Sequence, residues 1–403
     1  MGIAPVLIAG AGPVGVITAL ALAQRDIPVR VFEAAGRVND APRASTLHPA
    51  TLEMLAAVGL LDEIVARGLV ARTFQFWDRP ARRLIAEFDH AILKDDTPYP
   101  FVVQCEQHKV ANIAIARLKQ FSHAEVCFSS PVTAVVPGDD CVDITVEIDG
   151  RPETVSGSYL VGADGGRSLV RKSLDIAFEG YTFPERFLVL TSLFDFATEH
   201  GVAYRAYFSD PDEWANLFKV AGDDGLGRWR SVFPTLPGQT DDDGLNEVAT
   251  EGRLQKFFPN EKPYEIVHRN IYSVHQRVAA SFRKGRVFLA GDSAHVNNPI
   301  GGLGLNCGIH DAAHLAALLS AVLREERPPS DLETYDAVRR PMNIEYVQQQ
   351  TVTNKKRLEE RDPAVRQSNF DNLRRMAADP VAHRAFLMRT SLLESVRKRK
   401  AAA

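Results

Sequence analysis

Residues 1–33 carry a hydrophobic pattern that is typical of a βαβ unit. Residues 6–9 are all apolar, as expected for a short parallel strand that is buried on both faces. A glycine-rich turn follows at 10–15, and the alanine- and leucine-rich residues 16–24 predict a helix. A second strand is predicted at 29–33, so the chain opens as strand, helix and strand.

The rest of the chain alternates between short strands and a few helices. Short strands with turns are predicted for residues 72–101, a helix for 109–119, and a mostly β-like segment for 187–234. Residues 287–291 again have the pattern of a buried strand, and a helix is predicted after them at 305–323. This order predicts an α/β fold in which a dinucleotide-binding domain is interrupted by a mostly antiparallel β-sheet domain and followed by helices.

Composition and charge narrow the class of protein. The chain has 403 residues, more than one hydrophobic core usually supports, which favours at least two domains. Its 47 Lys and Arg side chains and 51 Asp and Glu side chains leave a net charge of −4. We therefore expect neither nucleic acid nor a membrane surface as a partner.

The four cysteines lie far apart, without a CxxC pair or a cluster with histidine. This spacing predicts neither a disulfide framework nor a metal site, and it favours a reducing compartment, the cytoplasm. No apolar run is long enough to span a bilayer.

The turn after the first strand has the sequence GxGxxG, formed by Gly10, Gly12 and Gly15. In dinucleotide-binding folds the first glycine permits the tight turn, the second lets a pyrophosphate approach the backbone, and the third lets the helix pack on the strand. The phosphates then lie at the N-terminus of the helix, where free N–H groups favour anions. Glu33 ends the second strand, where a carboxylate can accept hydrogen bonds from an adenosine ribose. The motif predicts dinucleotide binding without separating NAD from FAD.

Two later stretches carry further motifs. Residues 162–171 read GADGGRSLVR, and residues 285–295 read GRVFLAGDSAH. A glycine-rich turn at 301–304 then opens the next predicted helix. Together with the GxGxxG turn, these motifs resemble, in order and spacing, the single-component FAD-dependent aromatic hydroxylases of the p-hydroxybenzoate hydroxylase fold. The resemblance covers residues 5–345.

The resemblance implies which residues contact FAD. By their place in the matching motifs these are Gly10, Ala11, Gly12, Gly15, Glu33, Arg43, Gln107, Val132, Asp164, Asp292, Gly304, Leu305 and Asn306. Gln104 is an alternative to Gln107. Asp164 and Arg171 belong to a motif that the family links to both FAD and the nicotinamide cofactor, and Asp292 matches the aspartate that holds a ribityl hydroxyl. The predicted helix at 305–323, opened by the glycine-rich turn, would stabilise negative charge on the flavin if its N-terminus points there.

The implied function is that of an FAD-dependent monooxygenase. In the resembling family, NADH or NADPH reduces the flavin transiently, O2 forms a flavin C4a-hydroperoxide, and this species hydroxylates a phenol- or pyridinol-like aromatic substrate. No side chain is assigned as catalytic, because the cofactor carries the chemistry. The alternatives are a flavin oxidase or reductase on the same fold, and a non-catalytic redox-sensing flavoprotein. The resemblance is also compatible with a homodimer.

The predicted elements and motifs divide the chain into two domains and a C-terminal segment. The FAD-binding domain is predicted at residues 1–75, 106–180 and 275–345, the substrate domain at 76–105 and 181–274, and a C-terminal helical segment at 346–403. The candidate substrate contacts fall in or beside these segments.

The candidate substrate-pocket residues are Tyr204 and Tyr207, which we expect on one side of a strand, and Asn297 and Pro299 in the loop before the helix. Packing of aromatic residues in a sheet explains the two tyrosines equally well. His48, which precedes a proline, is interpreted as a residue of a helix start and not as a base. His295 is interpreted in the same way, as a residue that orders its loop.

Two departures from related patterns bear on the function. Members of the family often carry two prolines after the motif histidine, where this chain has Val296-Asn297-Asn298-Pro299. The related flavin halogenases carry a WxWxIP signature, whereas residues 229–234 read WRSVFP and lack the second tryptophan. The sequence therefore favours hydroxylation over halogenation.

Overall fold

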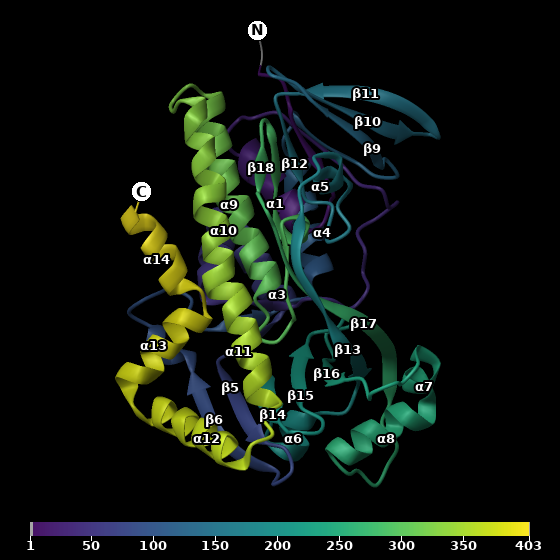
Figure 1. The fold of residues 1–403 in the computed structure, drawn as a ribbon, viewed down its shortest axis with the longest axis vertical. Coiled ribbons are helices and arrows are strands. Elements are labelled where there is room, and N and C mark those ends of the chain that lie inside the picture. The colour runs from purple at the N-terminus through teal and green to yellow at the C-terminus, as the bar shows by residue number, and fades with distance from the viewer. Residues whose placement is uncertain (1–2, 403) are drawn as a thin grey trace.

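The computed structural model describes residues 3–402, and Figure 1 shows their arrangement. A parallel sheet with its helices occupies the upper part of the view, a large antiparallel sheet the lower part, and the C-terminal helices lie along one side. Two long strands, β13 (Phe178–Ser192) and β17 (Ile266–Ala279), run between the two parts. This arrangement confirms the predicted α/β fold with an inserted antiparallel sheet and a helical C-terminal segment.

The upper part contains a six-stranded sheet in the order β18-β19-β12-β1-β2-β8. Its strands are β1 (Val6–Ala9), β2 (Val29–Phe32), β8 (Ala124–Cys127), β12 (Tyr159–Gly162), β18 (Arg283–Lys284) and β19 (Val287–Leu289). All neighbours pair in parallel except β18 and β19. Beside this sheet, helix α1 (Pro13–Ala23) packs against both α4 (Gln107–Leu118) and α9 (Gly304–Leu323). Because helices cover the sheet, β1 and β19 are buried throughout, as their uninterrupted apolar sequences predict.

The lower part is an eight-stranded sheet in the order β20-β17-β13-β16-β15-β14-β5-β6. Its other strands are β5 (Thr73–Asp78), β6 (Arg83–Asp89), β14 (Arg205–Ser209), β15 (Ala215–Val220), β16 (Arg228–Pro234) and β20 (His295–Val296). Neighbours pair antiparallel except β14 and β5, which are parallel. Side chains alternate between two cores along β14: Ala206 and Phe208 belong to one, and Tyr207 to the other.

Two small sheets, several short helices and three turns complete the description of residues 3–333. One antiparallel sheet contains β9 (Val132–Pro137), β10 (Val142–Ile148) and β11 (Arg151–Gly157), and the other contains β3 (Thr46–Leu47), β4 (Leu69–Ala71) and β7 (Val102–Gln104). The helices are α2 (Pro49–Ala57), α3 (Leu61–Arg67), α5 (Leu169–Ser173), α6 (Phe196–His200), α7 (Asp241–Leu245) and α8 (Glu247–Phe257). Three 3₁₀ turns lie at His90–Leu93, Gly291–Ser293 and Pro329–Glu333.

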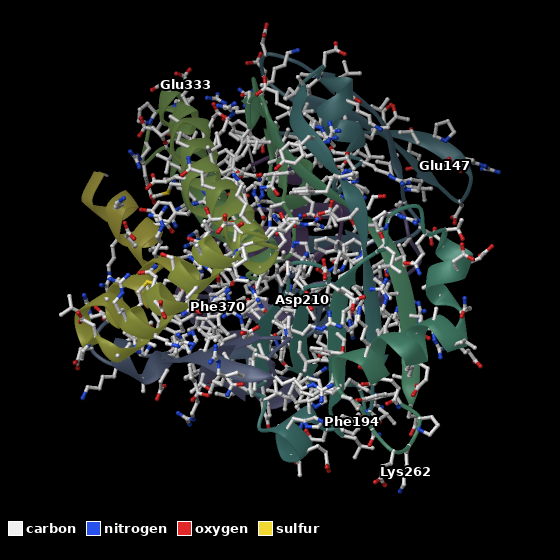
Figure 2. The ribbon with its side chains drawn as sticks, turned by 60° about the horizontal axis from the view of Figure 1, so that its bottom comes forward. Glu147, Phe194, Asp210, Lys262, Glu333 and Phe370 are labelled. Atoms are coloured by element: carbon white, nitrogen blue, oxygen red, sulfur yellow. The ribbon has the colours of Figure 1, made fainter. Side chains whose placement is uncertain are left out.

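The C-terminal segment is helical, as predicted, and covers one face of the large sheet. Helix α10 (Thr334–Asn343) precedes the predicted segment 346–403 and leads into it through a π-helical turn (Ile344–Gln348). The helices of the segment are α11 (Gln349–Leu358), α12 (Pro363–Ala378), α13 (Pro380–Thr390) and α14 (Leu393–Ala402). Figure 2 shows side chains filling the space between α12, where Phe370 is labelled, and the neighbouring strands. None of the helices within residues 3–402 has the length and apolar character needed to cross a membrane.

The predicted domain boundaries stay a prediction. Residues 1–2 and 403, the outer ends of the first and last predicted segments, lie outside the described residues. Strand β13 runs across the predicted boundary between residues 180 and 181, and β17 across the one between 274 and 275. The two parts of the molecule therefore share continuous strands.

Candidate active site

The glycines of the GxGxxG turn differ in what surrounds them. Gly10 has φ +104°, and a Cβ at this position would lie 2.4 Å from the Ala163 carbonyl oxygen. A Cβ on Gly15 would lie 2.0 Å from the Gly10 carbonyl oxygen, so these two glycines allow turn, helix and strand to pack closely. A Cβ on Gly12, in contrast, would meet no heavy atom within 4 Å. Gly12 is the N-cap of α1, so the open space lies where helix N–H groups favour an anion, and it fits the pyrophosphate of a dinucleotide.

Glu33 follows β2 and contacts the same turn. Its Oε2 accepts a hydrogen bond from the Ala11 N–H at 2.8 Å, and its Oε1 accepts one from the Ala35 N–H at 2.9 Å. The carboxylate is half-buried, and each oxygen keeps a lone pair for a ribose hydroxyl. Glu33 therefore both orders the turn and fits the ribose contact.

The motif at residues 162–171 joins two parts of the site. Asp164 accepts hydrogen bonds from the Ser168 hydroxyl at 2.6 Å and the Val170 N–H at 3.1 Å, so its carboxylate orders its own loop and the start of α5. Arg171 donates to the carbonyl oxygen of Ser293 at 2.7 Å. This bond connects the motif to the turn that carries Asp292.

Asp292 lies in the 3₁₀ turn that follows β19. Its carboxylate is open to solvent and accepts no hydrogen bond within the described part of the chain. Surrounding protein nevertheless raises the pKa of Asp292 above its ordinary value through desolvation, while the positive charges of His295 and Arg43 act in the opposite direction. An accessible carboxylate that accepts no hydrogen bond from the described residues can accept one from a ligand hydroxyl.

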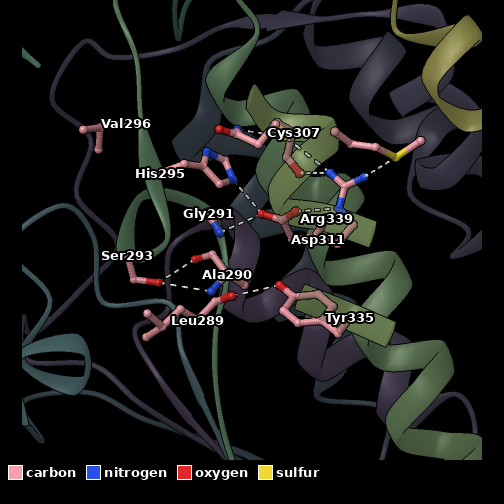
Figure 3. A network of polar contacts seen from close by, with 12 residues as sticks. Leu289, Ala290, Gly291, Ser293, His295, Val296, Cys307, Asp311, Tyr335 and Arg339 are labelled. Atoms are coloured by element: carbon pink, nitrogen blue, oxygen red, sulfur yellow. Dashed lines mark hydrogen bonds and ion pairs between the residues drawn. The ribbon is translucent and has the colours of Figure 1, made fainter. Parts of the chain in front are cut away.

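Asp311 of α9 fixes this turn through hydrogen bonds of its side chain, as Figure 3 shows. Its Oδ2 accepts from the Gly291 N–H at 3.1 Å and from His295 Nε2 at 2.7 Å, and its Oδ1 accepts from Arg339 Nε at 2.7 Å. Tyr335 of α10 donates its hydroxyl to a β19 carbonyl, that of Leu289, at 2.8 Å. Helices α9 and α10 thus fix the residues on both sides of Asp292.

This network carries buried charges. Burial alone would lower the pKa of His295, but the Cys307 sulfur and the Asp311 carboxylate raise it to about 10. Arg339 and His295 lower the pKa of Asp311 to about 2 against the effect of burial. His295, Cys307 and Asp311 bring metal-type ligand atoms within 4.8 Å of one another. Arg339 Nη2 lies 3.3 Å from the Cys307 sulfur and its charge opposes a cation, so we interpret the cluster as an ion-pair network.

The other expected cofactor residues near the site lie on loops and element ends. Arg43 is exposed, and its carbonyl oxygen accepts a hydrogen bond from Arg230 Nη1 at 2.9 Å. Gln107 begins α4, half-buried, while Gln104 is fully buried and its Oε1 accepts from the Thr46 hydroxyl at 3.0 Å. Val132 opens β9 and is also half-buried. Of the two glutamines, Gln107 is therefore the more accessible to a ligand.

The start of α9 offers main-chain groups and no free side chain. Asn306 Oδ1 accepts from the His48 N–H at 2.8 Å, and Asn306 Nδ2 donates to the carbonyl oxygens of Thr46 at 2.8 Å and Gly302 at 2.6 Å. Protein partners therefore occupy the Asn306 amide. The first-turn N–H groups of Gly304 and Leu305, with that of Asn306, remain to favour negative charge on a ligand.

A cavity lined mostly by aromatic and apolar side chains lies beside the loop that leads into α9. Its lining residues come from β5, β14, this loop, α11 and α13, and they are Phe74, Phe76, Arg205, Tyr207, Ile300, Gly301, Leu303, Gln350, Asn354, Leu358, Phe386 and Thr390. Because Gly301 and Leu303 line it, the cavity adjoins the N-terminus of α9.

Only one of the four expected substrate contacts lines this cavity. Tyr207 does, but Tyr204 packs on the other side, with its ring centroid 6.2 Å from that of Trp229. The expectation that both tyrosines face one side was wrong, since residues three positions apart on a strand point to opposite faces. Asn297 and Pro299 do not line the cavity; Pro299 is exposed.

Sequence reasoning missed most of the cavity residues. Phe74 and Phe76 did carry a signal, because their alternation places them on one side of β5. Arg205 and Phe386 carried none, because their segments contact the others only after folding.

The chain is similar in sequence to known proteins over nearly all of its length. A family model described as an FAD binding domain matches residues 3–350. Para-nitrophenol 4-monooxygenase of Pseudomonas sp. (strain WBC-3) is 33% identical over 390 residues, which cover 95% of this chain and 94% of that protein. 6-Hydroxy-3-succinoylpyridine 3-monooxygenase of Pseudomonas putida is 34% identical over 372 residues, covering 91% and 92%.

A solved structure agrees with these matches. The crystal structure of a p-nitrophenol 4-monooxygenase from Pseudomonas putida superimposes with a TM-score of 0.90 at 32% identity, over 96% of this chain and 97% of that chain. The sequence matches and the superposition extend over nearly all of this chain. The protein therefore belongs to the FAD-binding-domain family and is an FAD-dependent aromatic monooxygenase of the p-hydroxybenzoate hydroxylase fold.

Proposed function

We propose that this protein hydroxylates a small phenol- or pyridinol-like ring bound in the aromatic cavity, with NADH or NADPH as reductant and O2 as oxidant. The observation that carries the proposal is the position of the cavity: Gly301 and Leu303 both line it and lead directly into the N-terminus of α9. The relatives named above act on p-nitrophenol and on 6-hydroxy-3-succinoylpyridine, both of which are hydroxylated aromatic rings.

The walls of the cavity suit a flat ring. The rings of Phe76 and Tyr207 are stacked at 5.3 Å between centroids, and Phe74 meets Tyr207 edge-on at 6.2 Å. Aromatic walls favour another ring by offset stacking or edge-to-face contact. A few polar groups among apolar ones, here Arg205 and Asn354, are typical of a site that orients a small ligand.

The residues present fit FAD. The Gly12 turn would hold its pyrophosphate, Glu33 its ribose, and Asp292 its ribityl chain, while the first turn of α9 would face the flavin ring. When bound, FAD supplies the oxygen activation that no side chain of the chain provides. The chain's own residues bind and orient the substrate ring and exclude water from it.

The reductant has its own candidate surface. A second recess, lined in part by Asp40, His108, Arg228, Arg230 and His268, lies beside the loop that carries Arg43. It contains buried polar atoms without a hydrogen-bond partner in the described chain, among them Arg230 Nε and His268 Nε2. These atoms support a polar ligand there, and we assign NADH or NADPH to this recess.

Turnover measurements with a panel of phenols and pyridinols test the proposal. We expect slow NAD(P)H oxidation by the FAD-loaded enzyme alone and at least tenfold faster oxidation with the true substrate, a change of about 1.4 kcal/mol in the barrier. With labelled dioxygen, the product should carry one oxygen atom from O2. A product labelled only from water, or one peroxide released for each NAD(P)H with every effective substrate, would overturn the proposal.

A further inference from the structure

The loop between β20 and α9, residues 297–303, forms part of the cavity wall. Ile300, Gly301 and Leu303 line the cavity, and Leu303 directly precedes the first residue of α9. The loop contains one proline, Pro299, so a ring constrains its backbone at a single position. Contacts with other elements therefore determine where the rest of the loop lies.

Gln276 of β17 holds the middle of this loop. Its Oε1 accepts hydrogen bonds from the Asn298 N–H at 3.0 Å and from Asn298 Nδ2 at 3.3 Å. Asn298 is fully buried and Gln276 is 5% exposed, so bulk water does not reach these two bonds. Asn298 Oδ1 in turn accepts from the Ile300 N–H at 3.1 Å. Gln276 thus fixes, through Asn298, a residue that lines the cavity.

Gln348 extends this arrangement from the π-helical turn. Gln276 Nε2 donates to Gln348 Oε1 at 2.5 Å, and Gln348 Nε2 donates to the Val296 carbonyl oxygen at 3.2 Å. Short π-helical turns between α-helical residues are frequent at functional sites, and this turn brings Gln348 to the loop. The two amides together hold the chain at Val296 and at Asn298, where the loop begins.

Neither glutamine lines the cavity. On the basis of the proposed function, we propose that Gln276 and Gln348 are positioning residues, which hold the loop so that its cavity-lining residues keep one place relative to the start of α9. In the proposed function this helix start faces the flavin ring. The two amides therefore set the position of the substrate ring relative to the flavin, although they contact neither.

A substitution that removes the Gln276 amide should move the loop. Gln276→Met keeps nearly the same side-chain length and volume but removes both polar atoms. The N–H and the side-chain amide of Asn298 would then be buried donors without an acceptor, which is unfavourable. The loop can satisfy them only by shifting toward water or toward another acceptor, and Ile300 shifts with it.

Gln75→Met is the matched control. Gln75 lies in β5 of the same sheet and is also 5% exposed. Its Oε1 likewise accepts two hydrogen bonds, from Trp77 Nε1 at 3.0 Å and from the Ala203 N–H at 2.9 Å, and its Nε2 donates to Glu87 at 2.6 Å. Gln75 does not line the cavity. Its substitution therefore measures the general effect of removing a buried amide from this sheet.

Hydrogen exchange of the FAD-loaded protein, followed by mass spectrometry, is the first test. We expect the peptide that contains Asn298 and Ile300 to exchange at least about tenfold faster in Gln276→Met than in the wild type, and at the wild-type rate in Gln75→Met. Gln348→Met, which releases the Val296 carbonyl oxygen, should accelerate the same peptide and decides the question if Gln276→Met does not fold. Unchanged exchange in the variants of Gln276 and Gln348, or an equal acceleration in Gln75→Met, overturns the proposal.

Turnover with an aromatic compound that stimulates the wild type is the second test. We expect Gln276→Met to raise KM at least about fivefold and to lower the product formed per NAD(P)H at least about twofold, with peroxide making up the difference. The rate of NAD(P)H oxidation at saturating substrate should stay within about threefold of the wild type, and Gln75→Met should match the wild type throughout. Faster exchange with an unchanged KM and product yield would mean that the glutamines order the loop without positioning the substrate, and the proposal is then wrong.

The two tests separate this inference from the proposed function. If no aromatic compound stimulates the wild type, the proposed function is wrong, while hydrogen exchange still decides whether the two amides hold the loop. If the wild type is stimulated and Gln276→Met and Gln348→Met resemble it in both tests, the positioning role is wrong and the proposed function stands.

Discussion

The Asp311 carboxylate and the His295 imidazole lie 2.7 Å apart, Oδ2 to Nε2, with no exposed surface on either residue. Asp311 also bonds the Gly291 N–H and Arg339, so one carboxylate ties α9 and α10 to both sides of Asp292. The turn that carries Asp292 is therefore positioned by a fully buried residue of α9.

Replacing Asp311 should lower both the stability of the protein and its retention of FAD. Asp311→Asn leaves Arg339 and His295 buried with less compensating charge, and removing one partner of a buried pair typically costs about 3–5 kcal/mol. We expect a lower free energy of unfolding and weaker FAD retention, measured by urea denaturation and by cofactor release. Asp331→Asn, which removes the partly exposed pair with Arg327, is the control and should cost less than about 1 kcal/mol. Equal effects of the two variants would contradict a special role for Asp311.

The same pair should make stability depend on pH in a defined direction. The pKa of His295 is raised from 6.5 to about 10, so its contribution is complete below 6.5 and is lost as the pH rises toward 10. The pKa of Asp311 is lowered from 3.8 to about 2, so its contribution is complete above 3.8 and is lost as the pH falls toward 2. The difference in unfolding free energy between wild type and His295→Gln should therefore shrink between pH 6.5 and 10. Parallel urea-denaturation curves over that range would show that His295 is not charged in the folded protein.

Substitutions at different glycines of the GxGxxG turn should separate effects on cofactor binding from effects on folding. A Cβ at Gly12 meets no protein atom, so Gly12→Ala should fold normally yet lower FAD affinity at least tenfold, about 1.4 kcal/mol, by filling the space of the pyrophosphate. A Cβ at Gly15 would lie 2.0 Å from a backbone oxygen, so Gly15→Ala should instead reduce the yield of folded protein. Gly252→Ala, at an exposed and open position inside α8, is the control: it should leave FAD affinity unchanged and should not lower stability, because alanine favours a helix more than glycine does. Titration of each folded apoprotein with FAD, together with its circular dichroism spectrum, provides the comparison.

Asp292 should contribute to FAD retention through one charged hydrogen bond. Asp292→Ala should weaken FAD binding by about 1.5–3 kcal/mol, roughly ten- to a hundredfold. Stability of the apoprotein should change little, because the carboxylate accepts no hydrogen bond from the described residues in its place at the 3₁₀ turn. Unchanged FAD affinity would leave Asp292 as a residue of the turn alone.

Chromatography of the cofactor released from the wild type should show FAD and not FMN.

The sequence by itself determined the parts of this protein that depend on local backbone geometry. The positive φ of Gly10 and the close contact at Gly15 are requirements of a turn between adjacent elements, so the GxGxxG spacing predicts them directly. The apolar run of β1 is predicted because a strand buried on both faces needs no alternation. The three motifs together were sufficient to indicate the family.

Only the tertiary structure decided which side chains line the aromatic cavity. Phe74, Arg205 and Phe386 come from three distant segments, and they meet because β14 pairs with β5 and α13 packs near them. Asn306 illustrates the same limit: its amide is taken by Thr46 and His48, partners more than 250 positions away. Local spacing constrains a turn or the direction of a side chain on one strand. Which side chains share a cavity depends on how distant strands and helices pack, and that free energy is distributed over the whole chain.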